Sequence, residues 1–245
     1  MSSVDVLHGA LNGGLSKSDH SGVPVTCEEL AQDAQASSQE GAEAFHIHPR
    51  DKEGRETLDP ETIDRTVNEV KKASGCQVGV STGAWILPDT RRRVALIQKW
   101  KAPDFATVNL SEAGSADVMN ALYSAGIGIE AAIWKPEDAE RLNASGMSDE
   151  VLRVYVEPQG VGAQSAVSFV SGIHDELDRL GMNAPRLQHG DGEAAWILLE
   201  DAVRRGLDTR IGLEDTLRLP NERVASDNSE LVRETFSMCQ RHPRK

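Results

Sequence analysis

Short apolar runs recur along the chain and alternate with longer amphipathic stretches. Eight of these runs have the length and residue types of buried strands. They occupy residues 4–11, 42–48, 76–82, 105–111, 128–134, 153–158, 184–190 and 209–215. The regular alternation predicts repeated strand–helix units, not an all-β domain.

The stretches between the runs carry apolar residues at helical spacing, most clearly over residues 26–41, 59–75, 165–181 and 193–206. Thr26 followed by Glu29 predicts a capping box, and Asp59 before Pro60 predicts an N-cap with proline in the first turn. Glycines are placed where these helices are expected to end: Gly41, Gly75, Gly181 and Gly206.

Eight strand–helix units in 245 residues predict a single-domain (β/α)8 TIM barrel of the α/β class, spanning residues 1–245. A doubly wound open sheet is the alternative. It is disfavoured because no predicted strand is followed by GxGxxG or a Walker loop. No linker, low-complexity segment or break in composition divides the chain, so we expect one domain with short loops.

The composition is that of a soluble globular protein, with 39% hydrophobic and 27% charged residues. A net charge of −13 argues against general nucleic-acid binding, which needs a basic surface. The basic cluster Arg91–Arg93 lies in a predicted helix, and we interpret it as a solvated helix face in preference to a phosphate clamp.

No apolar run reaches the roughly 18 residues that a membrane span needs, and the N-terminal residues lack a signal-peptide pattern. We therefore expect a cytoplasmic protein without a membrane partner. The three cysteines are too widely spaced for a zinc finger or a disulfide framework, which favours reduced thiols.

Polar residues recur where the predicted strands end. In a TIM barrel the active site forms at the carboxyl ends of the strands, so this pattern predicts a site at that rim. The residues concerned are His46, His48, Ser81, Thr82, Thr107, Asn109, Glu130, Glu157, His189, Asp191, Glu214 and Asp215.

The tripeptide His46-Ile47-His48 predicts a metal site, because alternate side chains of a strand project to the same face. The plain alternative is an amphipathic strand end with two solvated histidines. Two imidazoles and one carboxylate form a common catalytic zinc shell, and Glu214 is the best third ligand because the eighth strand closes near the early ones. Asp215 would point away from that face unless a turn begins there.

Several stretches together resemble the β-keto acid cleavage enzyme family, in order and over nearly the whole chain. The pairing of HxHxRD with a late GLED is the most specific part of the resemblance. The stretches are ALNGG (10–14), VPVTCEELAQDAQASSQEGA (23–42), HIHPRD (46–51), VSTGA (80–84), ATVN (106–109), RIGLEDT (210–216) and NSELVRE (228–234).

The resemblance implies a zinc-dependent (β/α)8 barrel with one zinc ion per chain and acetyl-CoA as co-substrate. His46, His48 and Glu214 would bind zinc, and Asp215 would be the general base, assisted by Arg210 and Ser81. Substrate-binding residues are expected at the neighbouring strand positions Thr82, Thr107, Asn109 and Glu130. The implied reaction converts a β-keto acid and acetyl-CoA into acetoacetate and a new acyl-CoA, in a homotetramer.

The chain also departs from the family pattern. One member of the family acts on an aminated β-keto acid and has an acidic residue at the position that Leu15 occupies here. The apolar Leu15 disfavours a cationic substrate, unless Asp19 or another carboxylate substitutes. Glu157, His189 and Asp191 are additional ionisable groups at the sixth and seventh strand ends, and they place the CoA site in question.

Two alternatives therefore stay open. One is a CoA-independent, metal-dependent aldolase or hydrolase of keto or hydroxy acids. The other is a non-catalytic metal-binding member of the family. The barrel alone does not separate them, because function depends on the site.

Overall fold

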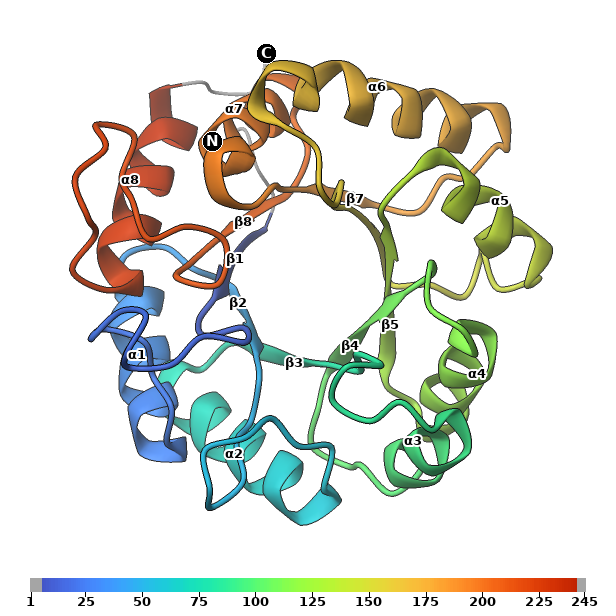
Figure 1. The fold of residues 1–245 in the computed structure, drawn as a ribbon, viewed down its shortest axis with the longest axis horizontal. Coiled ribbons are helices and arrows are strands. Elements are labelled where there is room, and N and C mark those ends of the chain that lie inside the picture. Colours follow the sequence, from blue (N-terminus) through green and yellow to red (C-terminus); the bar gives the residue numbers. More distant parts are fainter. Residues whose placement is uncertain (1–5, 242–245) are drawn as a thin grey trace.

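The computed structural model describes residues 6–241, and within them the chain folds as strands alternating with helices (Figure 1). The eight strands are β1 Leu7–Ala10, β2 Ala44–Ile47, β3 Gln77–Ser81, β4 Phe105–Asn109, β5 Gly128–Ile133, β6 Arg153–Val156, β7 Arg186–Gln188 and β8 Thr209–Ile211. Each matches a predicted run but is shorter, and residues 4 and 5 of the first run lie outside the described residues.

The strands form one parallel sheet in the order β7-β6-β5-β4-β3-β2-β1-β8. An isolated parallel bridge between Leu187 and Asp208 joins β7 to β8, so the sheet is nearly a closed ring (Figure 1). The predicted TIM barrel is confirmed. Its closure places β8 beside β1 and close to β2, and puts β6 across the barrel from β2.

The helices surround this ring (Figure 1). They are α1 Cys27–Gln39, α2 Pro60–Ser74, α3 Thr90–Ile97, α4 Ser115–Ala125, α5 Pro136–Ala144, α6 Ala163–Arg179, α7 Ala195–Arg205 and α8 Asn228–Arg241, with the short 3-10 helix η1 Gly192–Ala194 before α7. None of the helices within residues 6–241 has the length and apolar character that crossing a bilayer requires.

The predicted helix ends are also confirmed. Thr26 and Glu29 form a reciprocal capping box at α1, and Asp59 caps α2 with Pro60 in its first turn. Gly75 and Gly206 cap α2 and α7 in the left-handed conformation that glycine adopts without strain.

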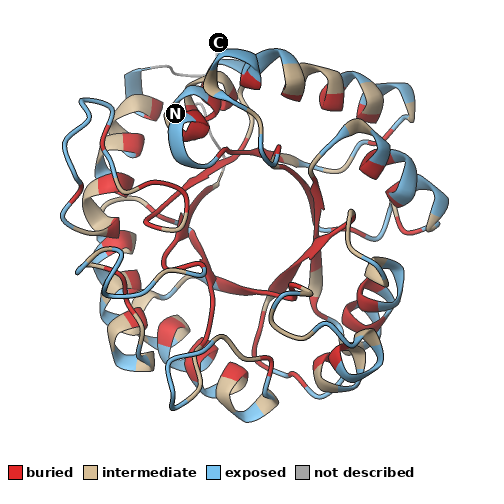
Figure 2. Cartoon of the chain, in the orientation of Figure 1, coloured by how far each residue is buried: buried red, intermediate tan, exposed pale blue. Residues whose placement is uncertain are grey.

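Strand residues alternate between two apolar environments. Ile133 and Val156 are paired in register and pack outward in the large core beneath the helices. Their neighbours Ala132 and Tyr155 are paired too, and cluster with Leu187 inside the barrel. Both faces of the strands are buried over most of the ring, as Figure 2 shows. This alternation determines which side chains reach the rim of the barrel interior.

The interpretation of Arg91–Arg93 as a solvated helix face is wrong for Arg93. Its side chain is 1% exposed, and it donates to Thr82 O at 3.3 Å and to Ala113 O at 3.1 Å. It also pairs with Glu112 at 3.0 Å. Arg93 faces the strand ends, where loop carbonyls need donors, and so it ties α3 to the loops that follow β3 and β4.

Candidate functional site

A cavity of about 410 Å³ opens at the carboxyl ends of the strands. Residues predicted from four different strand units line it together: His46, His48, Ser81, Thr107, Asn109, Arg210 and Glu214. Thr82, Glu130 and Asp215 lie beside or beneath the cavity and do not line it. The barrel therefore brings together at one rim residues that are up to 168 positions apart (46 to 214) in the chain.

His46 and His48 both project into the barrel, while Ile47 between them packs into the outer core. Asn12, which follows β1, holds this strand end. Its Nδ2 donates to His48 O, and its Oδ1 accepts from His48 N, each at 2.9 Å. The two imidazoles are almost fully buried, and their Nε2 atoms are 3.0 Å apart.

The other nitrogen of each imidazole has its own partner. Nδ1 of His48 contacts the Glu56 carboxylate, which can only accept, so this Nδ1 carries a hydrogen. Thr107 Oγ1 donates to Glu130 at 3.2 Å and lies 3.4 Å from Nδ1 of His46, from which it can accept. Partners of this kind orient metal-binding histidines, and here they leave both Nε2 atoms facing the cavity.

Glu214 and Asp215 were expected at the end of an extended eighth strand, and this is wrong. β8 ends at Ile211, and a turn follows in which the amides of Asp215 and Thr216 donate to Gly212 O at 2.9 and 3.0 Å. A Cβ on Gly212 would lie 1.8 Å from Ala10 O, so only glycine allows this turn to pass β1. The turn lets two consecutive carboxylates face the barrel interior.

The separations of the three candidate ligands fit a divalent metal. Glu214 Oε1 lies 3.8 Å from His46 Nε2 and 3.6 Å from His48 Nε2. Tetrahedral zinc with donors at about 2.1 Å would separate each pair by roughly 3.4 Å. Glu214 Oε2 is buried and has no hydrogen-bond partner among the described residues. Gly13, at a φ of 47°, leaves room for the side chain, because a Cβ there would lie 2.6 Å from Glu214 Cγ.

The electrostatics of these three residues are strongly perturbed. Burial lowers the pKa of His46 to about 3. Burial acts in the same direction on His48, but Glu214 and Glu56 outweigh it and raise the pKa of His48 to about 9. For Glu214, burial is opposed by Arg210 and the two imidazoles, which hold its pKa well below the usual range. A buried anion between two imidazoles is an environment that stabilises a cation.

Asp215 lies next to this cluster and is held by Arg210. One guanidinium nitrogen of Arg210 donates to Asp215 Oδ1 at 2.7 Å and to Glu214 Oε1 at 2.9 Å. Burial raises the pKa of Asp215 to about 6, although Arg210 and His189 act against it. Asp215 Oδ2 is buried without a hydrogen-bond partner in the described chain, so one oxygen is fixed and the other is free.

The remaining predicted residues take different positions. Asn109 lines the cavity and donates from Nδ2 to Glu112 at 3.0 Å. Thr82 donates to Thr107 O at 2.7 Å and so supports β4. Glu130 is fully buried beneath Thr107, beside Arg153 at 3.3 Å, and burial raises its pKa to about 7 against the opposing effect of Arg153.

The residues that depart from the family pattern are also dispersed. Glu157 lines the cavity that His46, His48 and Glu214 also line, and His189 lies behind it, whereas Asp191 is exposed before η1. Leu15 lines a different cavity, and Asp19 lines neither cavity and accepts hydrogen bonds from Ser16.

Sequence reasoning missed Glu56, Trp85, Trp134 and Asn12. Trp85 stacks on His48 at 6.2 Å between ring centroids and donates to Glu56 at 3.1 Å. Glu56 reaches His48 through an irregular loop, which strand periodicity does not describe. Trp134 directly follows β5 and could have been found by the strand-end rule, had it been applied to aromatic residues.

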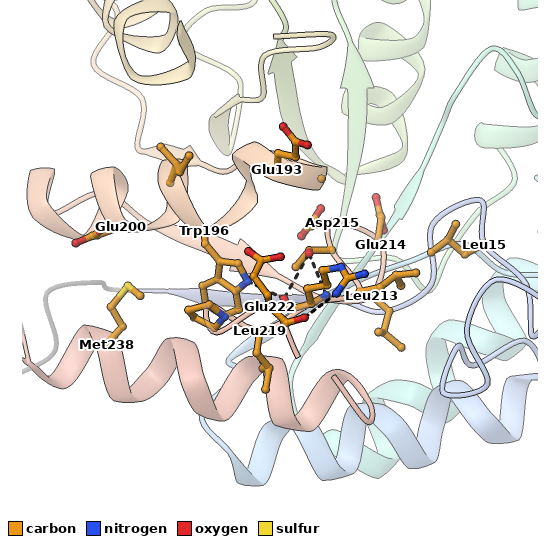
Figure 3. Close-up of a pocket in the computed structure, with 16 residues that line it drawn as sticks. Leu15, Glu193, Trp196, Glu200, Leu213, Glu214, Asp215, Leu219, Glu222 and Met238 are labelled. Atoms are coloured by element: carbon orange, nitrogen blue, oxygen red, sulfur yellow. Dashed lines mark hydrogen bonds between the residues drawn. The ribbon is translucent and has the colours of Figure 1, made fainter. Parts of the chain in front are cut away.

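A second, larger cavity of about 840 Å³ adjoins the first (Figure 3). It runs between α7, the segment after β8 and α8, and Glu214 is shared by the two linings. Trp196 lies in its middle, with Asp215 and Glu214 at one end and Met238 at the other (Figure 3). This larger cavity, which we call the groove, is therefore a route from the surface to the carboxylates of Glu214 and Asp215.

Comparison with known sequences gives consistent matches. The profile of the beta-keto acid cleavage enzyme family matches residues 6–245. A 3-oxoadipate:acetyl-CoA acetyltransferase of Cupriavidus necator is 25% identical over 266 residues, covering 96% of this chain and 88% of that protein. A 3-keto-5-aminohexanoate cleavage enzyme of Fusobacterium nucleatum is 25% identical over 236 residues, covering 89% and 84%.

Solved structures agree on the fold. The binary complex of ObcA with oxaloacetate superposes with a TM-score of 0.68 at 17% identity, and the match covers 86% of this chain and 62% of that one. The 3-dehydroquinate dehydratase of Aquifex aeolicus gives 0.60 at 10% identity, covering 98% and 100%. At these identities the likeness supports the barrel alone.

Proposed function

The chain belongs to the beta-keto acid cleavage enzyme family, and from this premise we propose that it is a zinc-dependent acyltransferase that exchanges acyl groups between a β-keto acid and acetyl-CoA. The observation that carries the proposal is the convergence of His46, His48 and Glu214, whose ligand atoms all lie within 4.8 Å of one another. Asp215 and Arg210 lie directly beside this cluster.

His46, His48 and Glu214 would hold one zinc ion per chain. Bound there, zinc would supply a Lewis acid for the β-keto oxygen, with a net positive charge that two neutral imidazoles preserve. Glu56 and Thr107 would keep the two rings in the tautomer that presents Nε2.

Asp215 is the general base of the proposed reaction. Arg210 fixes its Oδ1, and the unpartnered Oδ2 accepts the C2 proton of the β-keto acid. Ser81 lines the cavity and would assist by binding the substrate beside Asp215. Thr107 and Asn109 would contact the substrate, whereas Thr82 and Glu130 would act through Thr107, which each of them contacts.

Acetyl-CoA would approach through the larger groove, which ends at Asp215 (Figure 3). The C2 carbanion attacks the acetyl carbonyl and expels CoA as a thiolate. The thiolate then attacks the original ketone and the C2–C3 bond of the substrate breaks. The released enolate takes the proton back from Asp215, and acetoacetate and a new acyl-CoA leave.

One observation favours a second candidate, the CoA-independent aldolase or hydrolase. The groove is acidic: Glu193, Glu200 and Glu222 line it, and among the lining residues that the structure describes, Arg218 is the one Arg or Lys. Such a lining would repel the negatively charged phosphates of a CoA nucleotide, although it accommodates the uncharged pantetheine arm.

A product assay on zinc-loaded protein separates the two candidates. A panel of β-keto acids is supplied with and without acetyl-CoA, and products are identified by mass spectrometry. We expect acetoacetate and a new acyl-CoA only when acetyl-CoA is present, and their loss in Glu214→Ala. Cleavage without acetyl-CoA would instead assign the aldolase or hydrolase. The homotetramer and the cytoplasmic location stay predictions.

A further inference from the structure

Trp134 and Glu157 lie side by side at the rim of the barrel. They directly follow Ile133 and Val156, which are register partners, and Glu157 N donates to Ile133 O at 3.1 Å. Ile133 and Val156 pack outward, so the next residue on each strand faces the interior. Both side chains line the cavity that the metal ligands line.

This pair lies across the barrel from the histidines, because β6 and β2 are four strands apart in an eight-stranded ring. A β-keto acid whose carboxylate end lies at His46, His48 and Glu214 therefore directs its tail toward Trp134 and Glu157. The residues at this position contact the part of the substrate that differs from one β-keto acid to another.

The two side chains offer complementary hydrogen-bonding groups. Nε1 of Trp134 is buried and has no acceptor among residues 6–241. Glu157 accepts from Gln159 Nε2 at 2.8 Å, which leaves a carboxylate with further lone pairs. A buried indole N–H without an acceptor is costly, so a ligand that accepts from it gains binding free energy.

His189 completes the arrangement behind Glu157. Its ring is 1% exposed, and Nδ1 and Nε2 both lack hydrogen-bond partners within the described chain. It lies 3.6 Å from Glu157 Oε2 on one side and 3.6 Å from Asp215 Oδ1 on the other. His189 therefore packs against Glu157 at the cavity wall and lies between the carboxylates of Glu157 and Asp215.

The charges of the cavity exclude a second anion. Arg210 is the only Arg or Lys side chain among the described lining residues, and it is already bound to Glu214 and Asp215. Glu157 would repel a tail carboxylate. A tail ammonium would pair with Glu157 but has no lone pair to offer Trp134.

We propose that Trp134 and Glu157 form a subsite that selects β-keto acids whose tail carries an uncharged group able both to donate and to accept a hydrogen bond, such as a hydroxyl or a carboxamide. The group accepts from Trp134 Nε1 and donates to Glu157. This inference rests on the proposed function, because it assumes that the carboxylate end of a β-keto acid occupies the metal end of the cavity.

The test is calorimetric binding of β-keto acids of equal chain length to the zinc-loaded protein without acetyl-CoA. The tails are hydroxyl, carboxamide, alkyl, ammonium and carboxylate. We expect the hydroxyl or the carboxamide to bind at least about tenfold more tightly than the other three. Trp134→Phe, which keeps the aromatic wall, and Glu157→Met should each remove about tenfold of this preference and leave alkyl binding within about twofold.

Trp100→Phe is the matched control, since it removes an indole N–H that bonds Leu58 O away from the cavity. The subsite would be overturned if the alkyl compound bound as tightly as the hydroxyl and carboxamide compounds, or if the ammonium or carboxylate compound bound most tightly. It would also be overturned if Trp134→Phe kept the full preference for the hydroxyl or carboxamide compound. Parallel turnover assays keep the two proposals apart. If the protein prefers the hydroxyl or carboxamide compound but forms no acyl-CoA, only the proposed acyl exchange is contradicted. If acyl-CoA forms but the compounds bind without this preference, only the subsite is contradicted.

Discussion

At the scale of single residues, the positions of the proposed metal ligands could be predicted, because two of the three follow one local rule. Alternation along a strand places His46 and His48 on the same face, and it does so in the structure. Glu214 followed from barrel closure, which places β8 near β2. Glu56 could not be predicted, because its contact with His48 depends on the path of a loop without periodicity.

Replacing Glu56 tests whether this missed residue matters. Glu56→Gln removes the anion that holds Nδ1 of His48, so we expect zinc affinity to fall by about 10- to 100-fold. Competition with a chromophoric zinc chelator measures the change. Glu53→Gln, an exposed carboxylate in the same loop, is the control. Unchanged affinity in Glu56→Gln would show that Glu56 does not support the site.

At the scale of helices and strands, element types and caps were predictable, whereas strand ends were not. Local hydrophobic periodicity and capping residues indicated α1 and α2 correctly. β8 was predicted to run to residue 215 but ends at Ile211, because a glycine turn interrupts an otherwise suitable sequence. Arg93 was misjudged because burial of one helix face depends on neighbouring loops.

The role of Arg93 as a tie between elements gives a stability prediction. Arg93→Met leaves Glu112 and two loop carbonyls without their donor, and we expect a loss of about 3 kcal/mol in the free energy of unfolding. Urea denaturation measures it. Arg92→Met on the exposed side of α3 should change stability by no more than about 0.5 kcal/mol. Similar losses in both variants would contradict the assigned role of Arg93.

The contact between α1 and α8 makes stability depend on pH. Burial raises the pKa of Asp33 to about 7, beyond what the hydrogen bond from Asn228 Nδ2 at 2.6 Å offsets, with Asp227 adding to the rise and Lys17 opposing it. Because the folded pKa exceeds the unfolded value, ionisation of Asp33 costs stability as pH rises from about 4 to about 7.

Asp33→Asn removes this cost, so its stability relative to the unmodified protein should increase by about 2 kcal/mol between pH 5 and pH 8. Thermal or urea unfolding at the two pH values measures the difference. Glu28→Gln, on the exposed face of the same helix, should show no such increase. A pH-independent effect of Asp33→Asn would contradict the account.

At the scale of the whole molecule, the barrel explains why residues from distant parts of the chain act together. Parallel strands present their carboxyl ends at one rim, and closure brings β8, β1 and β2 side by side. The fold does not choose the reaction, since many activities share this architecture. The choice depends on the metal-ligand cluster and on the acidic groove that leads to it.

Tracing the acetyl carbons tests the proposed acyl exchange most directly. Zinc-loaded protein is incubated with an unlabelled β-keto acid and acetyl-CoA that carries ¹³C at both acetyl carbons. We expect both labels to appear together at carbons 3 and 4 of acetoacetate and the new acyl-CoA to be unlabelled. Cleavage of the β-keto acid without transfer of the label to acetoacetate would contradict the proposed acyl exchange.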